Sequence, residues 1–246
     1  MTRRPLPFDD PAVARLDGAA RQAMARHWRR RAWSEGQVAE AFATLHAGLL
    51  EVGAAGVVCG LIGRARDDEV RHSGVCAALA EAYAGAAIAA PAGPASTLPR
   101  FEHEARATEV MLQVVGMCCL SETLATVWLE ASLAAARAPL ARAANRAHLA
   151  EEVGHARAGW AHLATATSEQ LAAVERRLIG FVRAGVADWL AAGEDLPGGA
   201  GLEAHGVLSP AMHRAAILRG AREVVLPGFA ALGLDVAAAR RGLPDA

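Results

Sequence analysis

Two Glu-x-x-His motifs most strongly limit how this chain can fold. Glu-Val-Arg-His at residues 69–72 and Glu-Val-Gly-His at residues 152–155 each lie inside an apolar stretch with helical periodicity. Residues three apart share one helix face, so each motif can direct a carboxylate and an imidazole toward one point. One motif alone would be a weak signal. Two of them, each preceded by a suitable isolated Glu, predict a dinuclear metal site inside a helix bundle.

Composition favours helix and argues against two classes of partner. The 246 residues are rich in Ala and Leu, and the formal net charge is −1, with Arg supplying all of the Lys and Arg total. Such a balance predicts binding to neither nucleic acid nor an anionic membrane surface. High helix propensity and few aromatic or β-branched clusters predict an all-α fold.

From the sequence we expect neither a secretory signal nor a membrane-spanning segment. Residues 1–10 lack the apolar core of a secretory signal, and the apolar runs 53–63 and 110–120 are too short to cross a bilayer. Cys59 and Cys76 would lie roughly 25 Å apart on one predicted helix, so they cannot pair. We therefore expect a reducing, cytoplasmic location and no membrane.

Periodicity divides most of the chain into helices. The predicted ranges are 34–51, 57–87, 102–136, 140–164, 167–192 and 209 to 223 or 226. The first 25 or so residues are hard to assign, and 193–208 is predicted to be loop. The connections between the first four helices are short at 53–56, long at 91–99 and short at 137–139. This order is typical of a four-helix bundle with one long crossover.

The remaining helices should pack on this bundle, because the sequence contains no second hydrophobic core. We predict a single domain over 1–246, with the bundle at about 30–165 and a C-terminal helical extension at about 167–246. Thr167 and Gln170 form a potential capping box, and Ser209-Pro210 supplies an N-cap and an N1 proline.

Glu122 is predicted to lie at the height of the second motif. In an antiparallel helix hairpin, residues at one height are symmetric about the turn. The midpoint of Glu122 and Glu152 is residue 137, within the predicted turn. A carboxylate on an apolar stripe costs several kcal/mol unless it is paired or ligated. Glu122, Glu152 and His155 are therefore candidate ligands.

The first predicted helix offers two partners for Glu69 and His72. The midpoints with Glu69 are 52 for Glu35 and 54.5 for Glu40, so both fit the turn. Glu35 shares the apolar stripe that contains Val38 and Phe42, whereas Glu40 shares its face with small and polar residues. Glu35 is the preferred ligand, and Glu40 stays open as the alternative.

The combined pattern resembles the ferritin-like di-iron carboxylate superfamily, which includes rubrerythrins, ferritins and O2-activating oxygenases. It consists of Glu35, Glu69-x-x-His72, Glu122 and Glu152-x-x-His155, and the resemblance covers about residues 30–165. It implies a ferritin-like bundle and two iron ions, with glutamates bridging or terminally bound and one imidazole on each ion. The same ligands suit manganese or a mixed iron and manganese pair.

Asp68 and Glu151 directly precede the motif glutamates. The resemblance implies that Asp68 accepts the ring N–H of His155 and that Glu151 accepts that of His72, which would fix both imidazoles. The alternative is a simple exposed charged edge. The run at residues 29–31, three arginines, is likewise expected to be a solvated edge and not an anion site.

His148 narrows the expected function. With Glu152 and His155 it forms His-x-x-x-Glu-x-x-His, which resembles the arylamine N-oxygenase family, where an additional histidine on this helix ligates one iron. Seven residues span roughly 10 Å of helix, so His148 and His155 would converge only through long side chains or a distorted helix. The alternative is a histidine in the bundle core or at its rim.

These resemblances imply an oxidoreductase, specifically a dinuclear non-haem iron oxygenase (monooxygenase) or oxidase acting on a small organic substrate, with amine N-oxygenation as the particular form. It would use O2 as co-substrate and an external electron donor, with no catalytic residues beyond the ligands; a homodimer is left open. One alternative is a ferroxidase or peroxide-scavenging protein of the ferritin or rubrerythrin kind. The sequence lacks a Cys-x-x-Cys pair and is predicted to carry extra C-terminal helices, and both features weaken this first alternative. The second alternative is a non-catalytic helical module.

Overall fold

The structure is a computed structural model that describes residues 5–89, 97–197 and 201–245. Over these residues every regular element is helical, which confirms the predicted all-α class. The elements are α1 (Pro11–Arg15), α2 (Gly18–Glu51), α3 (Gly56–Ala84), α4 (Arg106–Val114), η1 (Val115–Glu122), α5 (Thr123–Ala135), α6 (Pro139–Leu163), α7 (Ser168–Glu194), η2 (Leu202–His205), α8 (Pro210–Gly220), η3 (Ala221–Val225), α9 (Leu226–Ala231) and α10 (Ala237–Arg241). η1 and η3 are π-helical, and η2 is a 3-10 turn.

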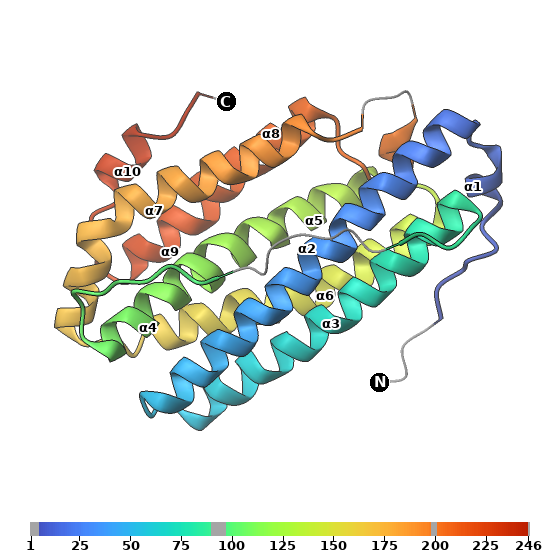
Figure 1. Ribbon diagram of the computed structural model, residues 1–246. Helices are drawn as coiled ribbons and strands as arrows, with labels where there is room; N and C mark the ends of the chain where they lie inside the picture. Colours follow the sequence, from blue (N-terminus) through green and yellow to red (C-terminus); the bar gives the residue numbers. More distant parts are fainter. Residues whose placement is uncertain (1–4, 90–96, 198–200, 246) are drawn as a thin grey trace.

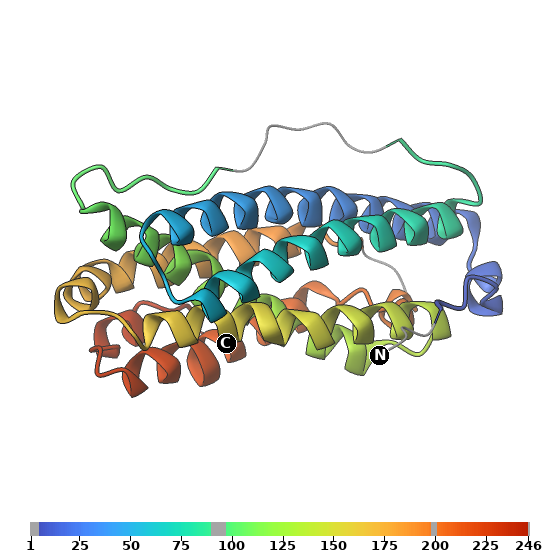
Figure 2. The ribbon, with the colours of Figure 1, turned by 90° about the horizontal axis from the view of Figure 1, so that it is seen from below.

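Four long helical segments lie side by side and form the body of the molecule (Figure 1). They are α2, α3, α6 and the continuous segment α4–η1–α5. α2 packs along α3, and α6 packs against both α3 and the α4–η1–α5 segment. α3 ends and α4 begins at opposite ends of this body (Figure 2). The chain between them covers 85–105, whereas the other two connections are only residues 52–55 and 136–138. Most of the predicted crossover 91–99 lies outside the described residues.

The start of α2 corrects the sequence prediction. α2 begins at Gly18 and not at residue 34, because the Asp17 carboxylate accepts a hydrogen bond of 2.7 Å from Ala20 N. This N-cap satisfies a free amide of the first turn. Met24 and Trp28, four residues apart, are buried on the inner face of the part of α2 that precedes residue 34. These apolar residues are few among many arginines, so the sequence pattern did not predict a helix here. At the other end of α2, Gly53 has φ +66°, which lets the chain reverse into α3.

The C-terminal helices pack against one side of α5 and η1 (Figure 1). Both predicted caps are confirmed: Thr167 and Gln170 form the capping box of α7, and Ser209 caps α8 with Pro210 at its first position. The predicted end at 223 or 226 is wrong. The helix continues through the π-helical η3 to Ala231, and the predicted loop 193–208 contains η2.

One helical stretch of the described chain, Arg106–Ala135, is long and apolar enough to cross a membrane, with a mean hydropathy of 1.6. However, 78% of that window is buried inside the protein, as in the core helix of a soluble protein. All four cysteines are buried and free, as expected from their spacing.

Candidate metal centre

Four buried side chains meet at the centre of the bundle. Glu69 comes from α3, Glu122 from η1, and Glu152 and His155 from α6. Each offers a ligand atom, and these atoms all lie within 4.8 Å of one another. Such a group of three carboxylates and one imidazole could hold a metal ion. We call it the four-residue group.

A π-helical stretch positions Glu122. η1 interrupts the third segment, and Glu122 is its last residue. A π turn inserts one residue and so rotates the later part of the helix by about 100° relative to a regular α-helix; such turns are frequent at functional sites. A Cβ at Gly159 would overlap Cys118 of η1, so the glycine allows α6 to approach closely. The sequence predicted a regular helix for this segment.

The two motif histidines direct the same atom at the same two carboxylates. His155 Nδ1 lies 3.0 Å from Glu69 Oε1 and 2.9 Å from Glu152 Oε2. His72 Nδ1 lies 3.3 Å from Glu69 Oε2 and 3.4 Å from Glu152 Oε1. Glu69 and Glu152 therefore lie between the imidazoles, the arrangement expected of carboxylates that bridge two ions.

The opposite ring nitrogens contact acids on the neighbouring helix. His72 Nε2 lies 2.9 Å from Glu151 Oε2, and His155 Nε2 lies 3.3 Å from Asp68 Oδ2. These are the two cross-helix contacts that the family resemblance implies. Arg71 forms ion pairs with both acids. With Nε2 donating to the acid, Nδ1 is the nitrogen that would bind a metal once its own proton has left.

The electrostatics are those of a buried cation site. Burial alone would lower the pKa of both motif histidines, but hydrogen bonds to the surrounding carboxylates outweigh it. They raise the pKa of His72 to about 11 and that of His155 to about 12. Burial, with the nearby Glu152 charge, raises the pKa of Glu122 well above its usual range. Despite burial, hydrogen bonds to His155 and His72 hold the pKa of Glu152 well below its usual range. Near pH 7 two imidazolium protons supply the positive charge, and a divalent ion could replace them.

The donor atoms also fit a metal. Glu69 Oε1 is buried and is ion-paired with His155 Nδ1 at 3.0 Å, but it makes no hydrogen bond of good geometry. A buried charged oxygen without a well-formed hydrogen bond costs free energy. Coordination would satisfy this oxygen, and a set of carboxylate and imidazole donors suits iron and manganese.

A second group adjoins the first. Glu35, Cys76 and His148 offer ligand atoms within 4.8 Å of one another, and the His148 ring centroid lies 4.3 Å from that of His72. Glu40, the alternative to Glu35, is exposed. Cys76 was not among the predicted site residues, although it follows His72 by four residues and so shares its face. Burial raises the pKa of the Cys76 thiol, which keeps it protonated.

Arg31 corrects the prediction of a solvated arginine edge. Its side chain is only 12% exposed, and its guanidinium carbon lies 4.9 Å from the ring centroids of both Trp28 and Trp128. The position was readable from the sequence, because Arg31 precedes Glu35 by four residues. Its hydrogen bonds run to Glu35 Oε1 at 3.0 Å, His148 Nδ1 at 3.0 Å and Asn145 Oδ1 at 3.3 Å. The neighbouring Arg30 does face solvent, 54% exposed and paired with Asp195.

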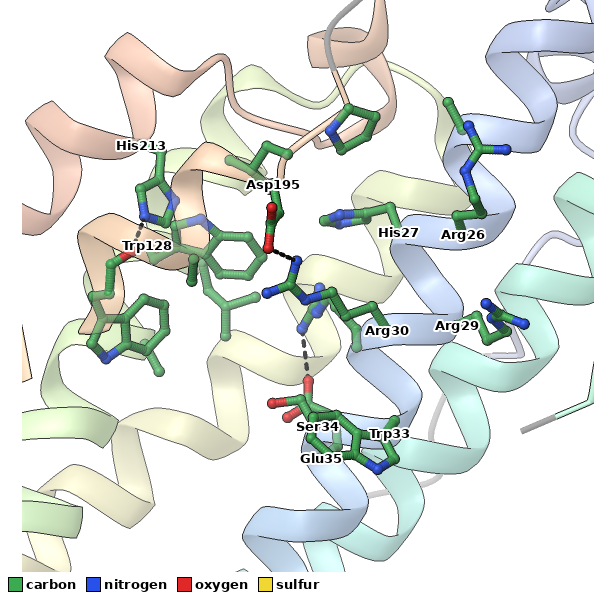
Figure 3. A pocket seen from close by; sticks show the side chains of 18 of the residues that line it. Arg26, His27, Arg29, Arg30, Trp33, Ser34, Glu35, Trp128, Asp195 and His213 are labelled. Atoms are coloured by element: carbon green, nitrogen blue, oxygen red, sulfur yellow. Dashed lines mark hydrogen bonds and ion pairs between the residues drawn. The ribbon is translucent and has the colours of Figure 1, made fainter. Parts of the chain in front are cut away.

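A cavity of about 620 Å³ lies beside the centre (Figure 3). Its lining includes Glu35 and Glu152, so it reaches candidate ligands of both groups. α2 forms one wall, and α5, α7 and α8 contribute the others. Figure 3 shows Arg30 of α2 reaching across to Asp195. The arginine and tryptophan side chains of the lining are Arg26, Arg29, Arg30, Arg31, Trp33, Trp128 and Trp189.

No protein-family model, curated protein or solved structure matches the chain. A functional proposal for this chain therefore rests on the two groups and the cavity.

Proposed function

We propose that this protein is a ferritin-like, dinuclear iron oxygenase or oxidase that activates O2 to oxidise a small organic substrate. The observation that carries the proposal is the position of two buried carboxylates between two imidazoles. Glu69 and Glu152 each lie within 3.4 Å of both His72 Nδ1 and His155 Nδ1. Bundles that bind two ions use one Glu from each of two helices and a Glu-x-x-His from each of the other two.

The ligands divide between two positions. One ion would be held by the four-residue group. The other would take His72 and Glu35 and would share the carboxylates of Glu69 and Glu152, with His148 as a further donor. Two reduced iron ions held this way supply the electrons that activate O2. The protein itself orients the imidazoles through Asp68 and Glu151.

The adjoining cavity favours oxidation of an organic substrate over iron storage. Its tryptophans offer flat apolar surfaces for an aromatic body, and its arginines offer hydrogen bonds to a negatively charged group. Because Glu35 and Glu152 belong to the lining, a molecule bound there would contact the ligands of the centre directly.

Amine N-oxygenation is the particular reaction proposed. One atom of O2 forms a bond to the amine nitrogen and gives a hydroxylamine, and the other atom leaves as water. The balance requires two electrons and two protons from an external donor. The motif formed by His148, Glu152 and His155 supports this choice, and the tryptophans of the cavity offer surfaces for the ring of an aromatic amine.

The test is turnover by the iron-loaded, reduced protein. It is exposed to isotopically labelled O2 with a panel of aryl and alkyl amines, and products are identified by mass spectrometry. We expect a hydroxylamine or nitro product that carries labelled oxygen. Glu122→Ala should abolish turnover, whereas Glu40→Ala, a change on the exposed face of α2, should not. A fully loaded protein without turnover across the panel removes the amine proposal.

Two other outcomes would favour the alternatives. Rapid Fe(II) oxidation that deposits ferric iron without any organic product would indicate a ferroxidase. Less than about one metal ion per chain after anaerobic Fe(II) loading, with a normally folded Glu69→Ala variant, would indicate a non-catalytic helical module, because dinuclear bundles bind two ions.

A further inference from the structure

Arg31 places a fixed positive charge at the second metal position. Its guanidinium group lies 4.9 Å from the ring centroids of two tryptophans and donates to Glu35 and His148. Both of these are candidate ligands of the same ion. An arginine stays protonated at every accessible pH and carries only donors. The guanidinium group of Arg31 therefore provides the second group with a positive charge and with hydrogen bonds in the absence of a metal ion.

The contact with His148 has a strict chemical consequence. Arg31 can only donate, so His148 Nδ1 must accept and carries the lone pair of a neutral imidazole. The ring proton then lies on Nε2, which is buried without a hydrogen-bond partner. Neither nitrogen can bind a metal in this arrangement, because one lone pair is engaged and the other nitrogen is protonated. Ligation by His148 and its hydrogen bond with Arg31 exclude each other.

Arg31 has space to withdraw. It lines the 620 Å³ cavity together with Arg30, so open space adjoins its side chain. The four-residue group is built differently, since His155 Nδ1 already faces Glu69 and Glu152. The two metal positions are therefore unequal before any ion binds.

We propose that Arg31 is a resident cation that competes with the second metal ion. The first ion enters the four-residue group, and the second binds Glu35 and His148 only after Arg31 has moved into the cavity. The inference rests on the proposed dinuclear centre and assigns the order in which it fills. Loading with one ion leaves Arg31 in place, and loading with two displaces it.

The test compares metal binding in the wild type with that in Arg31→Met and Arg30→Met. Methionine keeps an unbranched side chain beside the tryptophans and removes the charge, while Arg30 provides an exposed control. Anaerobic Co(II) titration against a chromophoric chelator should show two affinities in the wild type. In Arg31→Met the second ion should bind at least about tenfold more tightly, because a like charge has gone. The affinity for the first ion should be the same in Arg31→Met as in the wild type. In Arg30→Met both affinities should match the wild type.

Two outcomes overturn the inference in different ways. Equal second-ion affinity in Arg31→Met and the wild type removes the competition but leaves the dinuclear centre standing. If neither protein binds an ion in the four-residue group, the proposed function falls as well. Nitrogen NMR of the metal-free protein gives an independent result, with the His148 signal assigned by His148→Gln. We expect a bare Nδ1 and a protonated Nε2 in the wild type; a protonated Nδ1 would refute the Arg31 contact.

Discussion

Individual residues of the candidate centre are distinguished by which ring nitrogen faces which acid. His72 and His155 direct Nε2 to an acid on the neighbouring helix and Nδ1 to the shared carboxylates. His148 directs Nδ1 to Arg31 instead. Three buried histidines in one site thus have two different environments, and only two of them are oriented to accept a metal directly.

The acids behind the imidazoles should control metal affinity. Glu151→Ala leaves His72 Nε2 without its acceptor, so the ring loses its fixed orientation. We expect metal affinity to fall about 10–100-fold, the usual effect of removing such a partner. Chelator competition with Fe(II) or Co(II) measures it, and Glu40→Ala serves as the exposed control. Wild-type affinity in Glu151→Ala would contradict this role.

His27, which lines the cavity, should make folding sensitive to acid. Burial, with the charges of Arg31 and Arg30, lowers the pKa of His27 from 6.5 to about 3. The folded state therefore keeps His27 neutral while the unfolded state takes up a proton below pH 6.5. The contribution of neutral His27 to the free energy of unfolding is complete above pH 6.5 and is lost as the pH falls toward 3. At pH 5 this loss is about 2 kcal/mol.

His27→Gln should remove this part of the pH dependence. The drop in the free energy of unfolding between pH 7 and pH 5 should shrink by about 2 kcal/mol relative to the wild type. Urea denaturation at both values measures the two drops. An unchanged drop in the variant would show that His27 does not titrate as described.

Helix spacing and turn symmetry were enough to predict which glutamates and motif histidines the structure brings together. Arg31 escaped the same logic because a triplet of arginines looks like a charged edge. Successive helical residues point about 100° apart, however, so three in a row cannot all face solvent on a packed helix. Asn145 and Cys76 lie three and four residues from His148 and His72 and could have been found the same way.

Among the helical elements, the third segment departs most from its predicted form. The apolar run 110–120 is buried on nearly every side, so its sequence carries no phase, and the π-helical turn cannot be read from it. The start of α2 was missed for the opposite reason. Its charged residues outnumber its few large apolar ones, so the apolar stripe is too sparse to indicate a helix. Both errors concern the path of the backbone. They did not affect the predictions for Glu35 and Glu122, which the structure places in the two candidate ligand groups.

The close approach of α6 and η1 can be tested with two glycines of the same helix. A Cβ at Gly159 would overlap Cys118, whereas one at Gly154 meets nothing within 4 Å. We expect Gly159→Ala to destabilise the fold by about 1–3 kcal/mol through overpacking. Gly154→Ala should stabilise it by up to about 1 kcal/mol through its better helix propensity.

Thermal and urea unfolding of both glycine variants measures these effects. Gly159→Ala should also weaken metal binding, because η1 carries Glu122. Equal stability of the two variants would mean that α6 and η1 are not in close contact at this point.

For the molecule as a whole, the C-terminal helices do more than cover the bundle. α7 and α8 supply Trp189 and His213 to the cavity, opposite the arginines of α2. The sequence predicted that these helices pack on the bundle. It could not show that they form a wall beside the candidate metal ligands, because that depends on how separate elements dock and not on any local pattern.

Metal binding between α3, η1 and α6 is the property on which the proposed function depends. Anomalous diffraction from crystals loaded anaerobically with Fe(II) tests it directly. We expect a peak about 2.0–2.2 Å from ligand atoms of Glu69, Glu122, Glu152 and His155, as for imidazole and carboxylate ligands of a similar divalent ion. A second peak near His72 and Glu35 should appear at higher loading, with Arg31 displaced into the cavity. Saturated crystals with iron only at the surface, and none inside the bundle, would contradict a metal centre in this protein.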